Sequence, residues 1–348
     1  MAASSSSRPN FHLAGRYLVI LIVLGLAVHI YLPMIPTLEH SLQVVKQMAI
    51  WAMALAFIAQ ALSYLGAGYL LMSIIQLSAR VLTIFKATLI VLGSYSFGMA
   101  TGGMVGAAAA TYRWIEKEGT RSEVASIAST MPGFFNSIVL VLVSSAGMIH
   151  LLAVHQLSNL QVFGFALILL SLITATVILV WGYRHRSAVL QVSHRLGARW
   201  KGLRRRPYDP AKTDQWLAGL FEAWELMIEG GWRGPVLGAG LNVFFDMLTL
   251  YFLFIAAGHP VSPGVLLAGY GLPLLLGRVA FFIPGGIGVV EGTMVALYDG
   301  LGVPDSVSVV VVLTYRLLSF WLPLVIGFFL IGYLEKATIQ DYDADSVP

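Results

Sequence analysis

The chain contains long apolar runs, each about the length of a membrane-spanning helix. Met48–Met72 and Pro235–Ala257 are two of these runs, and one crossing needs about 20 mainly apolar residues. Only 11% of the residues are charged and the mean hydropathy is +0.81, whereas a soluble domain carries about 25% charged residues. Transmembrane barrels alternate apolar and polar residues, and these runs do not. The sequence therefore predicts an all-α polytopic membrane protein.

The runs divide the chain into two membrane halves. Residues 1–16 form a polar tail, 17–181 the first half, 182–233 a linker, 234–334 the second half and 335–348 a C-terminal tail. No small-residue cleavage site follows the first run, so we expect it to be retained. About six runs are predicted to cross the membrane completely: Tyr17–Leu32, Met48–Met72, Val124–Val154, Val162–Trp181, Pro235–Ala257 and Val307–Leu334.

The apolar segment 265–300 is interrupted at its centre. Phe281–Gly292 reads F-F-I-P-G-G-I-G-V-V-E-G, with Pro284, Gly285 and Gly286 at the interruption. A broken helix persists at membrane depth only where protein buries it or where it lines a cavity. These three residues are therefore the predicted tip of a functional site.

Basic residues predict a second interruption, in the segment 87–111. From Arg184 to Arg206 there are eight Lys or Arg and no acidic residue, which predicts a cytoplasmic loop. With a cytoplasmic N-terminus as well, segment 87–111 must enter and leave on one face, as a re-entrant hairpin turning at Thr101-Gly102-Gly103. The alternative is one ordinary glycine-rich span, with the basic loop exported.

The two interruptions resemble each other. Thr101-Gly102-Gly103-Met104 aligns with Pro284-Gly285-Gly286-Ile287 at an offset of 183 residues (284 − 101). Two copies of opposite topology, each with a broken helix, are typical of transporters whose site lies between the repeats. The alternative is that glycine pairs serve close helix packing, as in Gly98-x-x-x-Gly102.

Four ionisable residues in the second half are the candidate binding groups: Asp246, Arg278, Glu291 and Arg316. Charges at the centre of a membrane helix are costly and usually functional. The functional interpretation is that an arginine binds an anionic head group, because its guanidinium suits a phosphate, while the carboxylates hold it in place. The alternative is that the four charges pair and only stabilise the bundle. Glu291 either caps the half-helix that starts after Gly286 or competes with a ligand for its positive end.

The first half has no matching charges. At the same offset, the positions that correspond to Arg278, Glu291 and Arg316 are Tyr95, Ala108 and Gly133. The predicted site, with Thr101, Gly102 and Gly103 on its first-half side, is therefore asymmetric.

The linker carries a predicted basic amphipathic helix in His185–Arg206. Such a helix lies on the anionic cytoplasmic leaflet, either as an anchor or to gather a lipid substrate. We expect no cofactor, since the sequence has no cysteine, no H-E-x-x-H zinc motif and no P-loop.

Three blocks near the C-terminus resemble the lysylphosphatidylglycerol synthase transmembrane-region family. They are P-G-G-I-G-V-V-E-G (284–292), G-L-G-V-P (300–304) and Y-R-L-L-S-F-W-L-P-L-V-I-G (315–327). The resemblance implies an integral protein of the bacterial cytoplasmic membrane, of lipid-flippase type. It also implies roles for Pro284, Gly285, Gly286, Glu291 and Arg316. The best-known members carry a soluble synthase domain after this region, and because this chain ends at Pro348 we expect no aminoacyl transferase activity.

The sequence thus predicts a lipid translocator and not an enzyme. Its expected partner is a membrane lipid: an anionic or aminoacylated phospholipid, or another lipid-linked substrate. Self-association into a homo-oligomer is left open, and no nucleic-acid partner is expected. The alternatives are a membrane-embedded enzyme or enzyme partner acting on a lipid-linked substrate, and a scaffold whose charges only pair.

Overall fold

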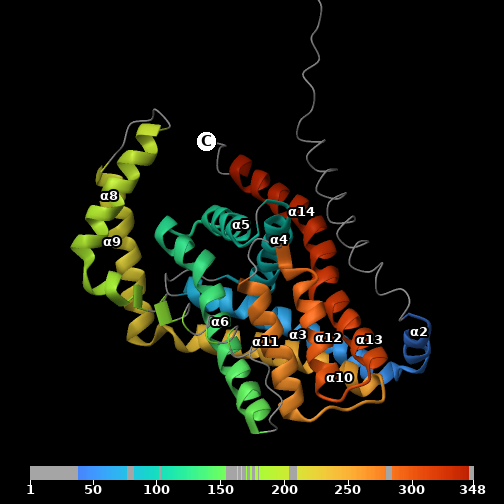
Figure 1. Cartoon of the computed structure of the whole chain (residues 1–348). Coiled ribbons are helices and arrows are strands. Elements are labelled where there is room, and N and C mark those ends of the chain that lie inside the picture. The colour runs from blue at the N-terminus through green and yellow to red at the C-terminus, as the bar shows by residue number, and fades with distance from the viewer. Residues whose placement is uncertain are drawn as a thin grey trace, which may run out of the picture.

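A computed structural model describes residues 38–76, 82–101, 103–153, 181–203, 210–279 and 284–344, with a few further residues between 163 and 180. Within these ranges the regular structure is helical (Figure 1). The predicted first span Tyr17–Leu32 lies outside the described residues, as does most of Val162–Trp181. The expected all-α class is confirmed for the part of the chain that is described.

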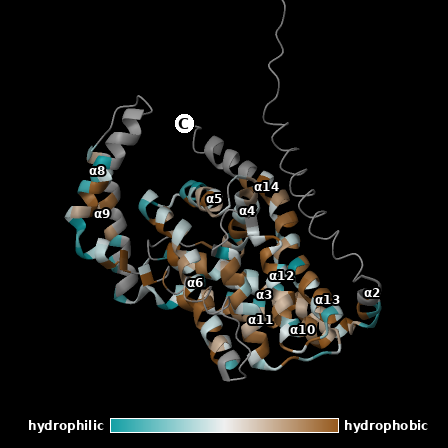
Figure 2. Cartoon of the chain, viewed as in Figure 1, coloured by the Kyte–Doolittle hydropathy of each residue, from teal (hydrophilic) through white to brown (hydrophobic). Residues whose placement is uncertain are grey.

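Five of the described helical segments are long and apolar enough to cross a membrane: Ile50–Ile75, Ile84–Thr101, Ser122–His150, Arg233–Ala256 and Asp305–Leu334. Four of them match predicted spans, and the other, Ile84–Thr101, is one arm of the predicted hairpin. Figure 2 shows apolar residues along these helices, while hydrophilic residues gather on α8 and α9. The segments therefore have the composition of a multi-pass membrane protein.

The helices α3 (Ile50–Ile75) and α10 (Arg233–Ala256) form the most extensive contact in the molecule. They run antiparallel, since Ala49 N donates to Ala256 O at 2.9 Å, while Ser73 lies beside Gly234 at the other end. A Cβ at Gly66 would lie 2.6 Å from Asn242 N, and one at Gly238 would lie 2.6 Å from Leu70 N. Glycine thus lets the two backbones touch, as is common in membrane bundles.

The predicted interruption at 101–103 is a turn between two antiparallel helices, α4 (Ile84–Thr101) and α5 (Met104–Lys117). Gly103 has a φ of +69°, a left-handed conformation that glycine adopts readily, and its N–H donates to Gly98 O at 2.6 Å. At the open end of this hairpin, Lys86 Nζ lies 2.5 Å from Glu118 Oε2. The first residues of α4 and the residues that follow α5 therefore lie side by side.

The predicted interruption at 284–286 joins a second pair of antiparallel helices, α11 (Pro263–Val279) and α12 (Val289–Gly300), through the 3₁₀ turn η4 (Pro284–Gly286). A Cβ at Gly277 would lie 2.4 Å from Val290 Cγ2 near the tip. Further from the tip, a Cβ at Gly269 would lie 2.2 Å from the Tyr298 ring. Both predicted breaks are thus helical hairpins closed by small residues.

Each hairpin packs against a long helix of the other half. The contact of α4 with α14 (Leu322–Ala344) and that of α11 with α6 (Ser122–Ala153) are among the largest in the molecule. Both rely on glycine. A Cβ at Gly327 would lie 2.2 Å from Leu92 O, and one at Gly147 would lie 2.5 Å from Ala268 N. The two halves therefore exchange equivalent contacts.

The last predicted span is a compound helix. Asp305–Arg316 (α13) passes through a π-helical turn, η5 (Leu317–Trp321), into α14. The sequence predicted a single run over Val307–Leu334. The π turn begins at the residue after Arg316, and such turns often accompany functional sites.

The linker folds as two helices, α8 (Arg186–Leu203) and α9 (Pro210–Leu226), which extend from the bundle (Figure 1). A second π-helical turn, η3 (Met227–Gly231), connects α9 to α10. The short helix α2 (Leu38–Gln47) packs against α13. The expected helix in His185–Arg206 is therefore present, and it has a partner helix in α9.

Candidate functional site

The tips of the two hairpins meet beside the π turn. A Cβ at Gly285 would lie 3.0 Å from Met99 Cε, in the last turn of α4. The rings of Tyr95 and Phe320 contact edge to face, with centroids 5.9 Å apart, and Ser96 Oγ donates to Leu324 O at 2.9 Å. Segments about 190 residues apart by their numbers (285 − 95) thus converge at one place.

Arg316 lies at the centre of this convergence and is bonded to protein groups through two of its nitrogens. Its Nε donates to Glu291 Oε1 at 2.6 Å, and its Nη2 donates to Gly285 O at 3.0 Å. Its guanidinium carbon lies 4.3 Å from the centroid of the Phe320 ring, close enough for a cation–π interaction. Arg316 therefore fastens the tip of the second hairpin to the compound helix.

Two roles were open for Glu291: it could cap the half-helix after Gly286 or compete with a ligand for the positive end of that helix. In the structure it caps α12. Its Oε2 accepts a hydrogen bond from Gly288 N at 2.7 Å while its Oε1 accepts from Arg316. Capping by a carboxylate satisfies an otherwise unpaired N–H at the positive end of the helix. Both oxygens of Glu291 are thus used by the protein.

Arg278 has a different environment, although it lies only six residues before Pro284 (284 − 278). It is an exposed residue in the last turn of α11. Its guanidinium donates to Gly133 O at 3.3 Å and to Ser137 Oγ, both on α6. Among the described residues its hydrogen-bond partners are neutral oxygens, so the charge of Arg278 is not balanced by a bonded carboxylate.

Asp246 lies between α10 and three other helices. Its Oδ2 accepts from Tyr315 Oη at 2.6 Å and from Tyr270 Oη at 2.8 Å. Its Oδ1 accepts from Gln60 Nε2 at 3.0 Å. These three donors are neutral, so within the described part of the chain Asp246 forms no ion pair. The four candidate charges therefore do not neutralise one another as two pairs.

The glycine and threonine candidates differ in role. Gly285 and Gly286 have φ values of +66° and +62°, and a Cβ at Gly286 would lie 2.9 Å from the Cα of Gly277. Thr101 is exposed and donates to Phe97 O at 2.7 Å, while Gly103 shapes the turn into α5. Gly102 lies outside the described residues, and the structure describes the backbone of Pro284 but not its side chain.

The structure adds residues that the sequence analysis did not select: Tyr95, Ser96 and Phe320 at the hairpin tips, Ser137 at Arg278, and Gln60, Tyr270 and Tyr315 at Asp246. Two residues of the site, Tyr95 and Gly133, are the positions that correspond to Arg278 and Arg316 at the offset of 183, but the sequence assigned no role to either. The other residues are uncharged, so the search for ionisable groups in the apolar segments did not select them.

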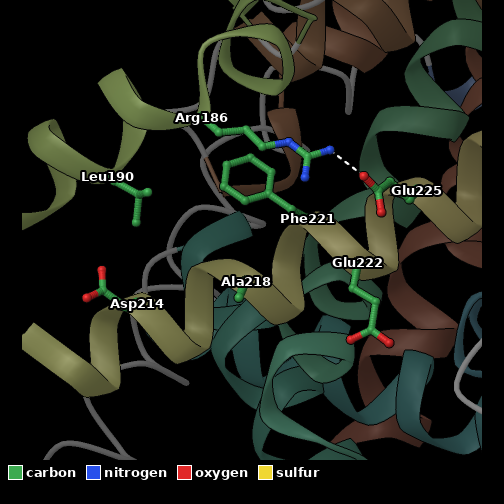
Figure 3. A pocket seen from close by; sticks show the side chains of 7 residues that line it. All are labelled: Arg186, Leu190, Asp214, Ala218, Phe221, Glu222 and Glu225. Carbon is green, nitrogen blue, oxygen red and sulfur yellow. Dashed lines mark hydrogen bonds and ion pairs between the residues drawn. The ribbon is translucent and has the colours of Figure 1, made fainter.

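A surface pocket of about 330 Å³ lies between α8 and α9 (Figure 3). Its lining includes Leu190 and Phe221 beside the ion pair of Arg186 with Glu225. The pairing with Glu225 raises the pKa of Arg186. The other two acidic residues of the lining also have basic partners: Asp214 lies 2.8 Å from His194, and Glu222 lies 3.0 Å from Arg121 of α6. The charges of this pocket are therefore already paired, and we do not assign it to the site.

The described residues also contain no group of His, Asp and Glu that could hold a metal.

Comparison with known proteins identifies one family over most of the chain, and similar membrane proteins over shorter stretches. A family model described as "Lysylphosphatidylglycerol synthase TM region" matches residues 17–327. A UPF0104 membrane protein of Methanothermobacter thermautotrophicus is 34% identical over 95 residues, 27% of this chain and 28% of that protein. One of Methanocaldococcus jannaschii is 30% identical over 125 residues (35% and 37%), and one of Pyrococcus horikoshii 32% over 102 residues (27% and 28%). The matches thus span about a third of the relatives' length.

Proposed function

The chain belongs to the lysylphosphatidylglycerol synthase transmembrane-region family, and from that premise we propose that it is a lipid translocator. It moves an anionic or zwitterionic phospholipid between the leaflets of a membrane, and it does so without an enzymatic step. The path runs between the two hairpins, at the interface of the two membrane halves. Arg278 is the residue that meets the lipid phosphate.

The observation that carries this proposal is that Arg278 is exposed and has no carboxylate partner among the described residues. It is the exposed guanidinium beside the second hairpin tip, and in the described residues it is bonded to neutral oxygens. A charge within a membrane segment needs a partner or a watery cavity. A phosphate is a suitable partner, because two parallel N–H groups of a guanidinium can bind two of its oxygens.

Arg316 supports the proposal as a positioning residue. It holds Gly285 and Glu291 in place, and those residues set the entry into α12. This keeps the hairpin tip, and with it the last turn of α11, at a fixed position next to α6. The lipid therefore meets a preformed arginine rather than a flexible one.

The length of the second helix of each hairpin supports a re-entrant arrangement. The helix α5 has 14 residues and α12 has 12, which correspond to about 21 Å and 18 Å of helix. The hydrocarbon core of a bilayer is about 30 Å thick. We infer that both hairpins enter and leave on one face, from opposite faces, as two inverted repeats. The reciprocal packing of α4 on α14 and of α11 on α6 supports the same symmetry.

The distribution of basic residues along the chain supports a cytoplasmic N-terminus in a bacterial cytoplasmic membrane. The eight Lys and Arg of 184–206 then lie on the cytoplasmic side. The helices α8 and α9 lie at the membrane surface, where the basic residues of α8 that α9 does not pair attract anionic lipid.

Reconstituted protein tests this function. Purified protein in liposomes of phosphatidylglycerol and phosphatidylcholine should accelerate the exchange of a headgroup-labelled phosphatidylglycerol between leaflets. Arg278→Ala should lose most of that exchange, and Arg278→Lys should keep part of it, because a lysine supplies the charge without the planar fork. Gly286→Leu should also lose exchange, because it fills the tip.

A matched control is Arg233→Ala, which removes another exposed arginine, at the start of α10. It should leave lipid exchange unchanged. Exchange by Arg278→Ala at the rate of the unaltered protein would contradict the role of Arg278. Chemical turnover of the lipid by the purified protein alone would instead favour a membrane-embedded enzyme.

A further inference from the structure

The carboxylate of Asp246 lies close to the middle of a membrane span. It is the fourteenth residue of α10, which runs from Arg233 to Ala256, so about 20 Å of helix precede it and about 15 Å follow it. It is partly buried, and three hydrogen bonds from neutral side chains fix its orientation. Its partners Tyr270, Tyr315 and Gln60 are 2%, 1% and 2% exposed. The site is thus built from three helices around one carboxylate.

The surrounding charges leave this carboxylate unbalanced. Glu291 and Arg316 form a buried pair whose net charge is zero. Arg316 is close enough to act on Asp246 electrostatically, but its hydrogen bonds go to Glu291 and Gly285. Arg278 is exposed at the end of α11, so ionised Asp246 leaves the remaining charges of the described core, Asp246, Glu291 and Arg316, with a net charge of −1, which is unfavourable in a low-dielectric interior. One proton would make the same core neutral.

The amide of Gln60 provides a place for that proton. Its Nε2 donates to Asp246 Oδ1, but its Oε1 is buried and has no hydrogen-bond partner within the described residues. A buried acceptor without a donor is unfavourable. If Asp246 carries a proton on Oδ1 and the Gln60 amide turns over, that O–H can donate to Oε1. The hydrogen bond then reverses its direction and the unpaired acceptor is used.

We propose that Asp246 is a proton-binding site, and that one proton taken up there accompanies each lipid moved. This rests on the proposed lipid translocation. The proton comes from water on one face, binds Oδ1 and leaves to water on the other face. No other bond is formed or broken. The proton reaches Asp246 through its partly exposed side. The neutral donors can hydrogen-bond to the carboxyl group in both its ionised and its protonated form.

The link to the hairpin tip runs through α13. Tyr315, a donor to Asp246, immediately precedes Arg316, and Tyr64 Oη donates to Leu318 O at 2.6 Å within the π turn. Protonation of Asp246 changes the acceptor to which Tyr315 donates. This acts on α13, whose last residue Arg316 is paired with Glu291 of α12. A change at Asp246 can thereby reach the tip of the second hairpin.

The titratable and charged groups facing Asp246 are few. They come from the helices that surround it: Tyr64 from α3, Tyr95 from α4, Tyr270 from α11, and Tyr315 and Arg316 from α13. The helix α6 also packs on α10, and its titratable groups Glu123 and His150 lie near its two ends. None of the facing groups ordinarily titrates near neutral pH. A proton taken up there belongs to Asp246.

Two measurements on the full chain test this site. The first is infrared difference spectroscopy of purified protein between acid and alkaline pH, which needs no lipid movement. It should show the band of one protonated carboxyl group that Asp246→Asn lacks and that Asp299→Asn, an exposed control at the end of α12, keeps. Tyr270→Phe, which keeps the carboxyl group and Gln60, should move the pH midpoint of that band upward, because the ionised form loses a donor to Oδ2.

The second measurement is lipid exchange in liposomes at several pH values and under a pH gradient. The unaltered protein should change its rate up to about tenfold per pH unit around the midpoint of the band, as expected for one linked proton, and Asp246→Asn should lose this dependence. Lipid exchange that is independent of pH, or that follows sodium concentration at fixed pH, would overturn the proton site and leave lipid translocation standing. A carboxyl band without any lipid exchange would overturn the translocation and the coupling, and keep the proton site.

Discussion

The Nε atom of Arg316 lies 2.6 Å from Oε1 of Glu291, and the two side chains are 5% and 2% exposed. This buried pair joins the compound helix α13–α14 to the first turn of α12. It leaves Arg278, and not Arg316, as the arginine available to a ligand. The pair therefore supports the tip of the second hairpin, while the exposed guanidinium of Arg278 is the group that we propose to bind the lipid phosphate.

Removing one member of the pair should destabilise the protein. Arg316→Met leaves the Glu291 carboxylate buried and without its cation, which costs about 3–5 kcal/mol in comparable cases. The free energy of unfolding in mixed detergent micelles measures this loss. The double variant Arg316→Met with Glu291→Gln removes both charges but keeps an oxygen for Gly288 N, and it should recover most of the stability. A single variant as stable as the unaltered protein would contradict the assigned pair.

Gly285 should tolerate no side chain. Its φ of +66° is unfavourable for other residues, by about 1–2 kcal/mol, and a Cβ there would lie 2.0 Å from the Phe320 ring. Gly285→Ala should therefore lower the thermal unfolding midpoint and lipid exchange together. Gly292→Ala is the matched control, since it lies in α12 with nothing within 4 Å of its Cβ position. Alanine favours a helix by about 1 kcal/mol over glycine, so this control should be as stable as the unaltered protein or more stable.

The contact between α3 and α10 should depend on Gly238. Its Cβ position lies 2.6 Å from both the N and the Cα of Leu70, so Gly238→Leu must separate two backbones that touch. We expect loss of the monodisperse protein in size-exclusion chromatography. Gly240→Ala, two residues away in the same helix and with open space around its Cβ position, should elute normally. Normal elution of Gly238→Leu would contradict this packing.

Cysteine labelling distinguishes the hairpin from an ordinary span, because the chain has no native thiol. Thr83 and Lys117 are exposed at the two ends of the first hairpin. Cysteines at these positions should react with a membrane-impermeant maleimide from the same face. A cysteine at His259, which follows α10 and is also exposed, should react from the opposite face. Labelling of Thr83→Cys and Lys117→Cys from opposite faces would rule out the hairpin.

Most of the helices could be predicted from the sequence. The runs Met48–Met72, Val124–Val154 and Pro235–Ala257 correspond to α3, α6 and α10, and both glycine-rich interruptions are turns between helices. Apolar length and helix-breaking residues are local properties, so they can be identified without knowing any contact. The π turn after Arg316 was not predicted, although Pro323 lacks the N–H that would bond to the carbonyl of Ser319 within Leu317–Trp321.

The charged part of the candidate site was predicted only as a set of residues, without their partners. The sequence showed two arginines and two carboxylates in the second half, and it left open whether they pair. Only one pair forms among the described residues, between Glu291 and Arg316. Asp246 takes neutral donors from α3, α11 and α13, and Arg278 takes neutral acceptors from α6. Partner choice depends on which helices are neighbours, and spacing along the chain does not contain that information.

By itself, the sequence determined that this chain is a multi-pass membrane protein, where its helices break, and which few charges its apolar segments carry. These follow from transfer free energies and backbone conformations of individual residues, which add up along the chain. The tertiary structure alone decided that the two breaks meet, that Arg316 is bonded to a carboxylate and that Arg278 is bonded to neutral oxygens. Those outcomes depend on close contacts between helices far apart in the sequence, which the glycines at Gly66, Gly147 and Gly327 permit without specifying.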